Sequence, residues 1–237
     1  MRRELHPTDR YLVTPLYSVA EAARILSMPS SSLRNWAIGY SIKRAGGQQV
    51  LAEPLVTTEP PAPGSRATVP FIGLAEAHTL LAFKAAGVPV QRIRPAITWL
   101  EEHLGLVQAL ASERLMTDGA EVLYDFASST EDADAREAVD GLVVVRSGQQ
   151  VFRPVVRDYL SRVEYRDGWI CLIRIPGYGR VDVTVDPRIN GGRPTIRRRG
   201  IPVDAVLGRL RRGEAAGEVA TDYHLTRSEI SALQAAA

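Results

Sequence analysis

Four polar residues of one short segment have the types and spacing that could contact nucleic acid: Ser31, Ser32, Arg34 and Asn35. The apolar residues interleaved with them, Leu33 and Trp36-Ala37, fall on the opposite face if the segment is helical. Serine, arginine and asparagine side chains reach the phosphates and base edges of duplex DNA. The pattern therefore predicts a DNA-binding helix, although an ordinary helical hairpin with a polar surface accounts for it equally well.

A first helix must hold this second one in place. Ser18 and Glu21 form a capping box, and apolar residues then recur at helical spacing from Val19 to Leu26. After a three-residue turn we expect Ser30 to cap the second helix and Gly39 to occupy the left-handed position at its end. Two short helices joined in this way predict a helix-turn-helix.

A wing is expected after the two helices. Residues Gln49–Val56 and Ala67–Phe71 read as strands on either side of Glu59–Ser65, a segment rich in proline and glycine. Lys43 and Arg44 fall where such a wing would approach the DNA backbone, and a solvated loop is the alternative.

Two further helices are predicted, one over Leu74–Ala85 and one over Ile93–Leu104. Pro95 removes an amide from the second, so that helix either bends or starts late. In order and motifs, residues 16–104 resemble the winged-helix domain of the MerR family. The resemblance implies that Arg34 anchors the second helix to phosphate, while Asn35 stands where many relatives carry an aromatic residue. MerR activators continue into a long helix that forms a coiled-coil dimer; no such heptad repeat follows here, so effector-driven activation is not supported.

Composition limits the remaining possibilities. The net charge is +2, distributed as +3 over residues 1–104, −4 over 105–178 and +3 over 179–237. One cysteine and four scattered histidines predict neither a disulfide framework nor a zinc site. No apolar run reaches the ~20 residues that cross a bilayer, and no secretory leader is evident, so we expect a cytoplasmic protein. No nucleophile–base constellation is present, so we predict a non-enzyme without catalytic residues, metal or cofactor.

The middle of the chain is expected to be a small α/β unit and a candidate for dimerisation. Its predicted elements are a hairpin over Leu115–Phe126, a solvated acidic loop over Ser128–Glu137, a strand over Leu142–Val145, a helix over Val151–Leu160 and a hairpin over Val163–Ile175.

The C-terminal segment carries the densest positive charge, Arg197, Arg198 and Arg199. We predict that these arginines lie in a strand over Thr195–Arg199, so that Arg197 and Arg199 share a face. Helices should follow, the last capped by Thr226 and Glu229.

The motif around Asp186-Pro187, Gly192, Pro194, Ile196-Arg197 and Gly213 resembles a small module of unknown function in VapB-like antitoxins. The residues Arg198-Arg199-Gly200 stand where many relatives have Gly-Thr-Arg. The partners of that family are PIN-like ribonuclease toxins, and its members join the module to a MerR-like N-terminal domain. The resemblance therefore implies an antitoxin that binds such a toxin and represses its own operon.

We accordingly predict a mainly α protein with small β elements in three parts: a winged helix-turn-helix DNA-binding domain (1–104), an α/β middle segment (105–178) and an antitoxin module with a β-hairpin and three helices (179–237). The expected partners are double-stranded operator DNA, a PIN-like ribonuclease toxin and a second copy of the chain. DNA would contact Ser31, Ser32, Arg34, Asn35, Lys43 and Arg44. Toxin, or alternatively DNA, would contact Arg197, Arg198 and Arg199, and a solvated edge is the third alternative. A free-standing MerR-like regulator that responds to a small ligand explains the N-terminal half equally well.

Overall fold

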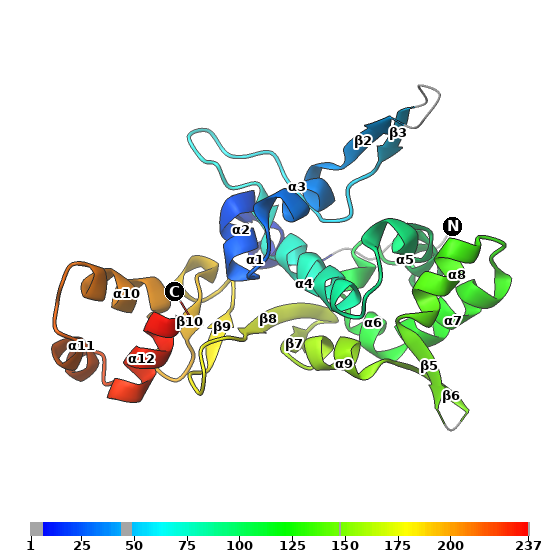
Figure 1. Cartoon of the computed structure of the whole chain (residues 1–237). Helices are drawn as coiled ribbons and strands as arrows, with labels where there is room; N and C mark the ends of the chain where they lie inside the picture. Colours follow the sequence, from blue (N-terminus) through cyan, green and yellow to red (C-terminus); the bar gives the residue numbers. More distant parts are fainter. Residues whose placement is uncertain (1–6, 44–48, 147, 237) are drawn as a thin grey trace. The chain divides into compact units, whose positions relative to one another are not determined.

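Helices dominate the structure, a computed structural model that describes residues 7–43, 49–146 and 148–236 (Figure 1). The chain divides into two compact units, Met1–Ile170 and Cys171–Ala237. Small two-stranded sheets accompany the helices of unit 1, and the strands of unit 2 are part of a larger antiparallel sheet. The predicted fold class, mainly α with a helix-turn-helix and small β elements, is confirmed.

Unit 1 is built around α4 (Phe71–Ala85), which is buried on almost every side. Phe71, Leu74, Leu80 and Phe83 have no exposed surface, as expected of a helix that is apolar all round. The other helices of unit 1 are α1 (Arg10–Val13), α2 (Val19–Ile25), α3 (Ser30–Ile38), α5 (Val90–Leu104), α6 (Glu113–Thr117), α7 (Gly119–Ser129), α8 (Ala133–Asp140) and α9 (Pro154–Leu160).

The helix-turn-helix consists of α2 and α3. The Ser18–Glu21 capping box is present, with the Ser18 amide 2.8 Å from Glu21 Oε2 and the Glu21 amide 3.2 Å from Ser18 Oγ. The prediction that Ser30 caps α3 is wrong. Pro29 occupies the cap position with extended backbone and no side-chain bond, so Ser30 is the first helical residue.

The wing is formed by different strands from those predicted. Strand β2 (Tyr40–Lys43) pairs antiparallel with β3 (Gln49–Ala52), immediately after α3. Strand β4 (Val69–Pro70) pairs instead with β1 (Pro15–Tyr17). The strand expected over Gln49–Val56 stops at Ala52, because the amides of Leu55 and Val56 turn away to donate to Trp36 O.

The helices around α4 match the predictions more closely. Residue Phe71 already starts α4, and α5 begins at Val90 and runs through Pro95 to Leu104. Hence α5 does not start after the proline.

Residues 105–170 lie in unit 1 and are more helical than predicted. The hairpin expected over Leu115–Phe126 is wrong: Ser112 caps α6, and α7 follows directly with one buried face. The acidic loop expected over Ser128–Glu137 is also wrong, because Asp132 accepts a hydrogen bond from the Ala135 amide and starts α8. In both segments buried residues recur every three to four positions, a periodicity the acidic side chains disguise.

Strand β5 (Val143–Arg146) confirms the expected strand, and it pairs with β6 (Gln149–Phe152). The predicted helix over Val151–Leu160 is right only from Pro154, where α9 begins. The predicted hairpin is confirmed as β7 (Val163–Arg166) and β8 (Trp169–Ile175); β8 continues into unit 2.

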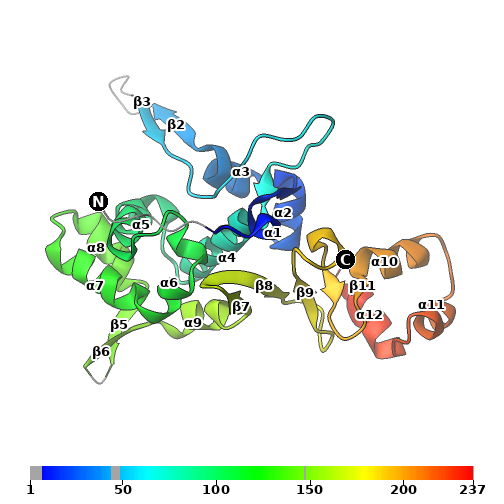
Figure 2. The same cartoon turned by 180° about the vertical axis from the view of Figure 1, so that it is seen from behind.

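In unit 2, β8 pairs with β9 (Val183–Val185), which pairs with β10 (Thr195–Ile196), and β10 pairs with β11 (Ile201–Pro202). Three helices follow: α10 (Val203–Arg211), α11 (Ala216–Asp222) and α12 (Arg227–Ala235). The three helices contact one another (Figure 1 and Figure 2). The predicted capping box of Thr226 and Glu229 is present at the start of α12.

Candidate nucleic-acid interface

The outward face of α3 carries the residues that the sequence singled out. Ser31, Arg34 and Asn35 are exposed and Ser32 is half-buried. On the inward face, Leu33, Trp36 and Ala37 are at most 6% exposed. Burial of the inward face against the fold leaves the polar side chains of α3 turned to solvent, where they can donate hydrogen bonds to phosphates and base edges.

The wing residues of the prediction are only partly described. Lys43 is the last residue of β2 and pairs with Gln49. Arg44 lies outside the described residues. At its other end, β2 begins one residue after α3, with Gly39 between them.

Gly39 is required at this junction. Its φ is +75°, and a Cβ there would lie 2.3 Å from Ala52 O, at the end of β3. A glycine thus lets the wing pass close to the C-terminus of α3. The positive φ agrees with the expectation for this position, although ψ of −177° differs from that of a left-handed helix.

The segment after the wing holds α3 from behind. The amides of Leu55 and Val56 both donate to Trp36 O, at 2.7 and 3.1 Å. Next along the chain, the Thr57 amide donates to Glu76 Oε2 at 2.6 Å, and the Thr57 hydroxyl donates to Glu76 Oε1 at 3.1 Å. The segment therefore joins α3 to the buried core helix α4.

Glu76 is an unusual anchor because it is a carboxylic acid residue that is only 4% exposed. Burial raises its pKa to about 8, against the lowering effect of the two Thr57 hydrogen bonds. The side chain is therefore protonated at neutral pH.

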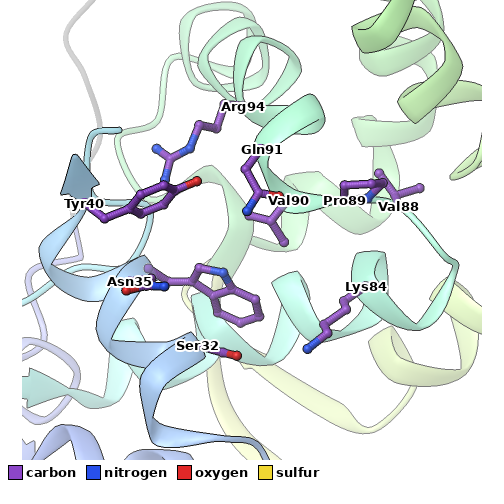
Figure 3. A pocket seen from close by; sticks show the side chains of 10 residues that line it. Ser32, Asn35, Tyr40, Lys84, Val88, Pro89, Val90, Gln91 and Arg94 are labelled. Carbon is purple, nitrogen blue, oxygen red and sulfur yellow. The ribbon is translucent and has the colours of Figure 1, made fainter. Parts of the chain in front are cut away.

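A small cavity of about 180 Å³ lies beside the exposed face of α3 (Figure 3). The polar side chains that line it are Ser32, Asn35, Tyr40, Lys84, Gln91 and Arg94. Among the described residues its lining contains two cations and no carboxylate, a composition that suits an anion such as a backbone phosphate.

Lys84 and Gln91 were missed by the sequence reasoning. Lys84 is in the last turn of α4 and Gln91 in the first turn of α5, on either side of the Gly87–Pro89 connection. The available signal was that Lys84 is one of only two lysines in the chain. Nothing in the local sequence reveals that this connection packs next to α3.

A second, larger cavity of about 820 Å³ opens in unit 1 between the 52–58 segment and α5. Its charged lining residues are Glu53, Glu76, Arg94 and Glu101, and Val56 and Ile97 contribute to its apolar wall. The Arg94 guanidinium also donates to Glu53 O. Arg94 consequently lines both cavities.

The three arginines of unit 2 do not lie in a strand. Strand β10 ends at Ile196, and Arg197, Arg198 and Arg199 form a turn in which the amides of Arg199 and Gly200 both donate to Ile196 O. The prediction that Arg197 and Arg199 share a strand face is therefore wrong. The positive φ of Gly200, +66°, allows the chain to reverse into β11 so soon.

Arg198 forms an ion pair with Glu229, in the first turn of α12. Its Nε and Nη2 lie 3.0 and 2.5 Å from Glu229 Oε1, and Nη2 lies 2.5 Å from Oε2. Arg197 and Arg199 are exposed in the same turn.

In the residues that the structure describes, no group of three His, Cys, Asp or Glu side chains could hold a metal ion. Within those same residues, no helix combines the length and the apolar character needed to span a bilayer.

Two different protein families match the N-terminal and C-terminal parts of the chain. Residues 15–97 match a family described as "Putative DNA-binding HTH domain". Residues 183–235 match a second family, described as "Protein of unknown function (DUF433)".

Two relatives span nearly the whole chain. A protein of Mycobacterium tuberculosis (strain ATCC 25618 / H37Rv) named "Putative antitoxin VapB45" is 44% identical over 218 residues, which is 91% of each chain. The X-ray crystal structure of Rv2018 from Mycobacterium tuberculosis is 42% identical, with a TM-score of 0.82 over 93% of this chain and 98% of that one. The chain therefore belongs to the VapB-like antitoxin family, and its N-terminal part is a helix-turn-helix DNA-binding domain.

Proposed function

We propose that this protein is the antitoxin of a type II toxin–antitoxin pair, which represses its own operon and neutralises a PIN-like ribonuclease toxin. The observation that carries the proposal is the exposed polar face of α3 beside a cation-lined cavity, in a chain 44% identical to a VapB antitoxin. Neither task requires catalysis.

Operator binding is assigned to unit 1. Arg34, Lys43 and Arg44 would contact phosphates and position α3, while Ser31, Ser32 and Asn35 would contact base edges. A homodimer would place two copies of α3 one helical turn apart on the duplex, ~34 Å. Residues 142–175 are the proposed dimer interface.

Toxin binding is assigned to the arginine turn of unit 2. A PIN-like nuclease gathers several carboxylates around its metal ions, and guanidinium groups pair with carboxylates in a bidentate fashion. Arg197 and Arg199 are exposed in the turn and would occupy that acidic centre. Arg198 would act mainly by holding the turn against α12 through Glu229.

The test separates the two activities. The Arg34→Ala, Lys43→Ala, Arg44→Ala triple variant should lose operator affinity and show a flatter dependence of affinity on salt, by about one unit per lost phosphate contact. It should still rescue cells that express the adjacent toxin gene. The Arg197→Ala, Arg199→Ala double variant should lose rescue and keep operator binding.

A matched control is Arg180→Ala, which removes an exposed arginine of unit 2 outside the turn. Full operator affinity in the triple variant would overturn the DNA assignment. Intact rescue with lost DNA binding in the double variant would reassign the arginine turn to the operator.

The cavity of about 820 Å³ favours one alternative, a regulator that responds to a small ligand. Its volume is within the range of small-molecule sites, and its wall, residues 52–58, is bonded to α3 through Trp36 O. Two observations together would replace the antitoxin proposal with this alternative: no toxin gene lies beside this one, and operator binding depends on a metabolite.

A further inference from the structure

Unit 2 contains a copy of the local geometry of the N-terminal helix-turn-helix. Helices α2 and α11 each have seven residues, α3 and α12 each have nine, and four residues connect each pair. Val19 thus corresponds to Ala216 and Ser30 to Arg227, so that equivalent residues differ by 197 in number.

The two turns are the same in backbone conformation. The second turn residue is left-handed in both, with φ of +53° at Ser27 and +52° at His224. The amide of the following residue donates to the carbonyl five residues earlier, from Met28 to Ala23 O at 2.9 Å and from Leu225 to Ala220 O at 2.8 Å. Left-handed residues other than glycine are uncommon, so their coincidence at equivalent positions marks a shared motif.

The buried positions also correspond. Each first helix buries its fourth and fifth residues, Ala22-Ala23 and Val219-Ala220. Each turn buries its third residue, and each second helix buries its fourth and seventh: Met28, Leu33 and Trp36 in the first motif, and Leu225, Ile230 and Leu233 in the second. The same face of the second helix is therefore left exposed in both motifs.

The exposed face of α12 is polar and begins with a cation. Arg227, Ser228 and Ser231 are exposed at its first, second and fifth positions. Glu229 is the single carboxylate of α12, and the Arg198 ion pair neutralises it. Over residues 171–237 the chain has eleven arginines against seven carboxylates.

We propose that α11 and α12 form a second DNA-binding helix-turn-helix, whose α12 contacts the operator duplex through Arg227, Ser228 and Ser231. In helix-turn-helix proteins the N-terminal residues of the second helix contact base edges in the major groove, and Arg227 and Ser228 occupy those positions. A single chain then carries two recognition helices of different sequence. This inference deepens the proposed operator binding and rests on it.

The experiment uses the full chain and a duplex from the region upstream of its own gene. Hydroxyl-radical footprints and fluorescence anisotropy titrations at several salt concentrations are compared for wild type, Arg227→Ala and Arg34→Ala. Arg180→Ala serves as the matched control for loss of one exposed positive charge in unit 2. Arg227→Lys keeps the charge and tests whether loss of the arginine merely disturbs folding.

We expect two protected tracts with wild type. Arg227→Ala should lose one tract, bind roughly fivefold or more weakly and show a salt slope smaller by about one, while Arg227→Lys should recover the salt slope. Arg34→Ala should lose the other tract.

An unchanged footprint and salt slope with Arg227→Ala would overturn the inference, as would loss of toxin rescue with intact DNA binding, which would assign the α12 face to the toxin. If Arg34→Ala had no effect but Arg227→Ala removed a tract, the role proposed for α3 would fail and that of α12 would stand.

Discussion

The Arg198 guanidinium donates hydrogen bonds to both oxygens of the Glu229 carboxylate, and the Glu229 side chain also forms the capping box of α12. One carboxylate therefore fastens the arginine turn to the start of the last helix. The Arg198 hydrogen bond is the main cause that lowers the pKa of Glu229 to about 2.

This pair predicts an acid-sensitive contribution to stability. Because the folded-state pKa of Glu229 is lowered, its contribution is fully present above the unfolded-state value of about 4.5 and is lost as the pH falls towards about 2. Arg198→Ala should remove up to about 1 kcal/mol from the free energy of unfolding at pH 7 and flatten the loss in acid. Hydrogen exchange of the α12 amides between pH 3 and 7 measures this contribution to stability in wild type and variant. Arg199→Ala, in the same turn, is the control and should behave as wild type.

Glu76 predicts the opposite pH dependence for unit 1. The unfolded chain loses this proton near pH 4.5, but the folded protein keeps it up to about 8. Unfolding therefore releases a proton in that interval, and the free energy of unfolding should fall as the pH rises, by at most about 1.4 kcal/mol per pH unit. Glu76→Gln, which resembles the protonated form, should remove this contribution, so the difference in free energy of unfolding between wild type and variant should change with pH in urea titrations from pH 5 to 8. A difference that stays constant over this range would contradict the prediction.

Gly39→Ala should destabilise the junction between α3 and the wing. The new Cβ would meet Ala52 O at 2.3 Å in addition to the cost of a positive φ, so we expect a loss of about 2 kcal/mol or more. Gly64→Ala is a matched control, because Gly64 has a similar φ of +79° and open space around it. It should lose only about 1 kcal/mol. Equal losses for the two variants in thermal unfolding would show that the close approach to Ala52 has no energetic weight.

Lys84 tests the cavity beside α3. If a backbone phosphate occupies this cavity, Lys84→Gln should weaken operator binding across sequences and reduce the salt slope by about one. Arg157→Gln, an exposed change on α9, should leave the slope unaltered. A change in base preference with an unchanged salt slope would argue for a base contact instead.

The sequence predicted the elements whose signals are local. The two capping boxes depend on residues three apart, and both appear in the structure at the expected positions. The amphipathic character of α3 was likewise readable, because Leu33 and Trp36 alternate with polar residues within a single helix.

The predictions were wrong where contacts between residues far apart in the sequence determine the local structure. Nothing near Thr195–Arg199 indicates that β10 stops at Ile196, since both the sharp reversal at Gly200 and the anchoring of Arg198 depend on the rest of unit 2, including Glu229. The cavity beside α3 likewise needs Lys84, which is far along the chain from Ser32. The helix α8 was missed because its acidic exposed residues concealed the buried stripe of Ala135 and Val139.

The hydrogen bonds from the Leu55 and Val56 amides to Trp36 O also affect the heat-capacity change expected on DNA binding. Because they fix α3 to its supporting segment in the free protein, contact with DNA requires no ordering of that helix. The heat-capacity change on association should therefore be accounted for by the area of the interface alone. Coupled folding and binding would add the burial of about 1,000–3,000 Å².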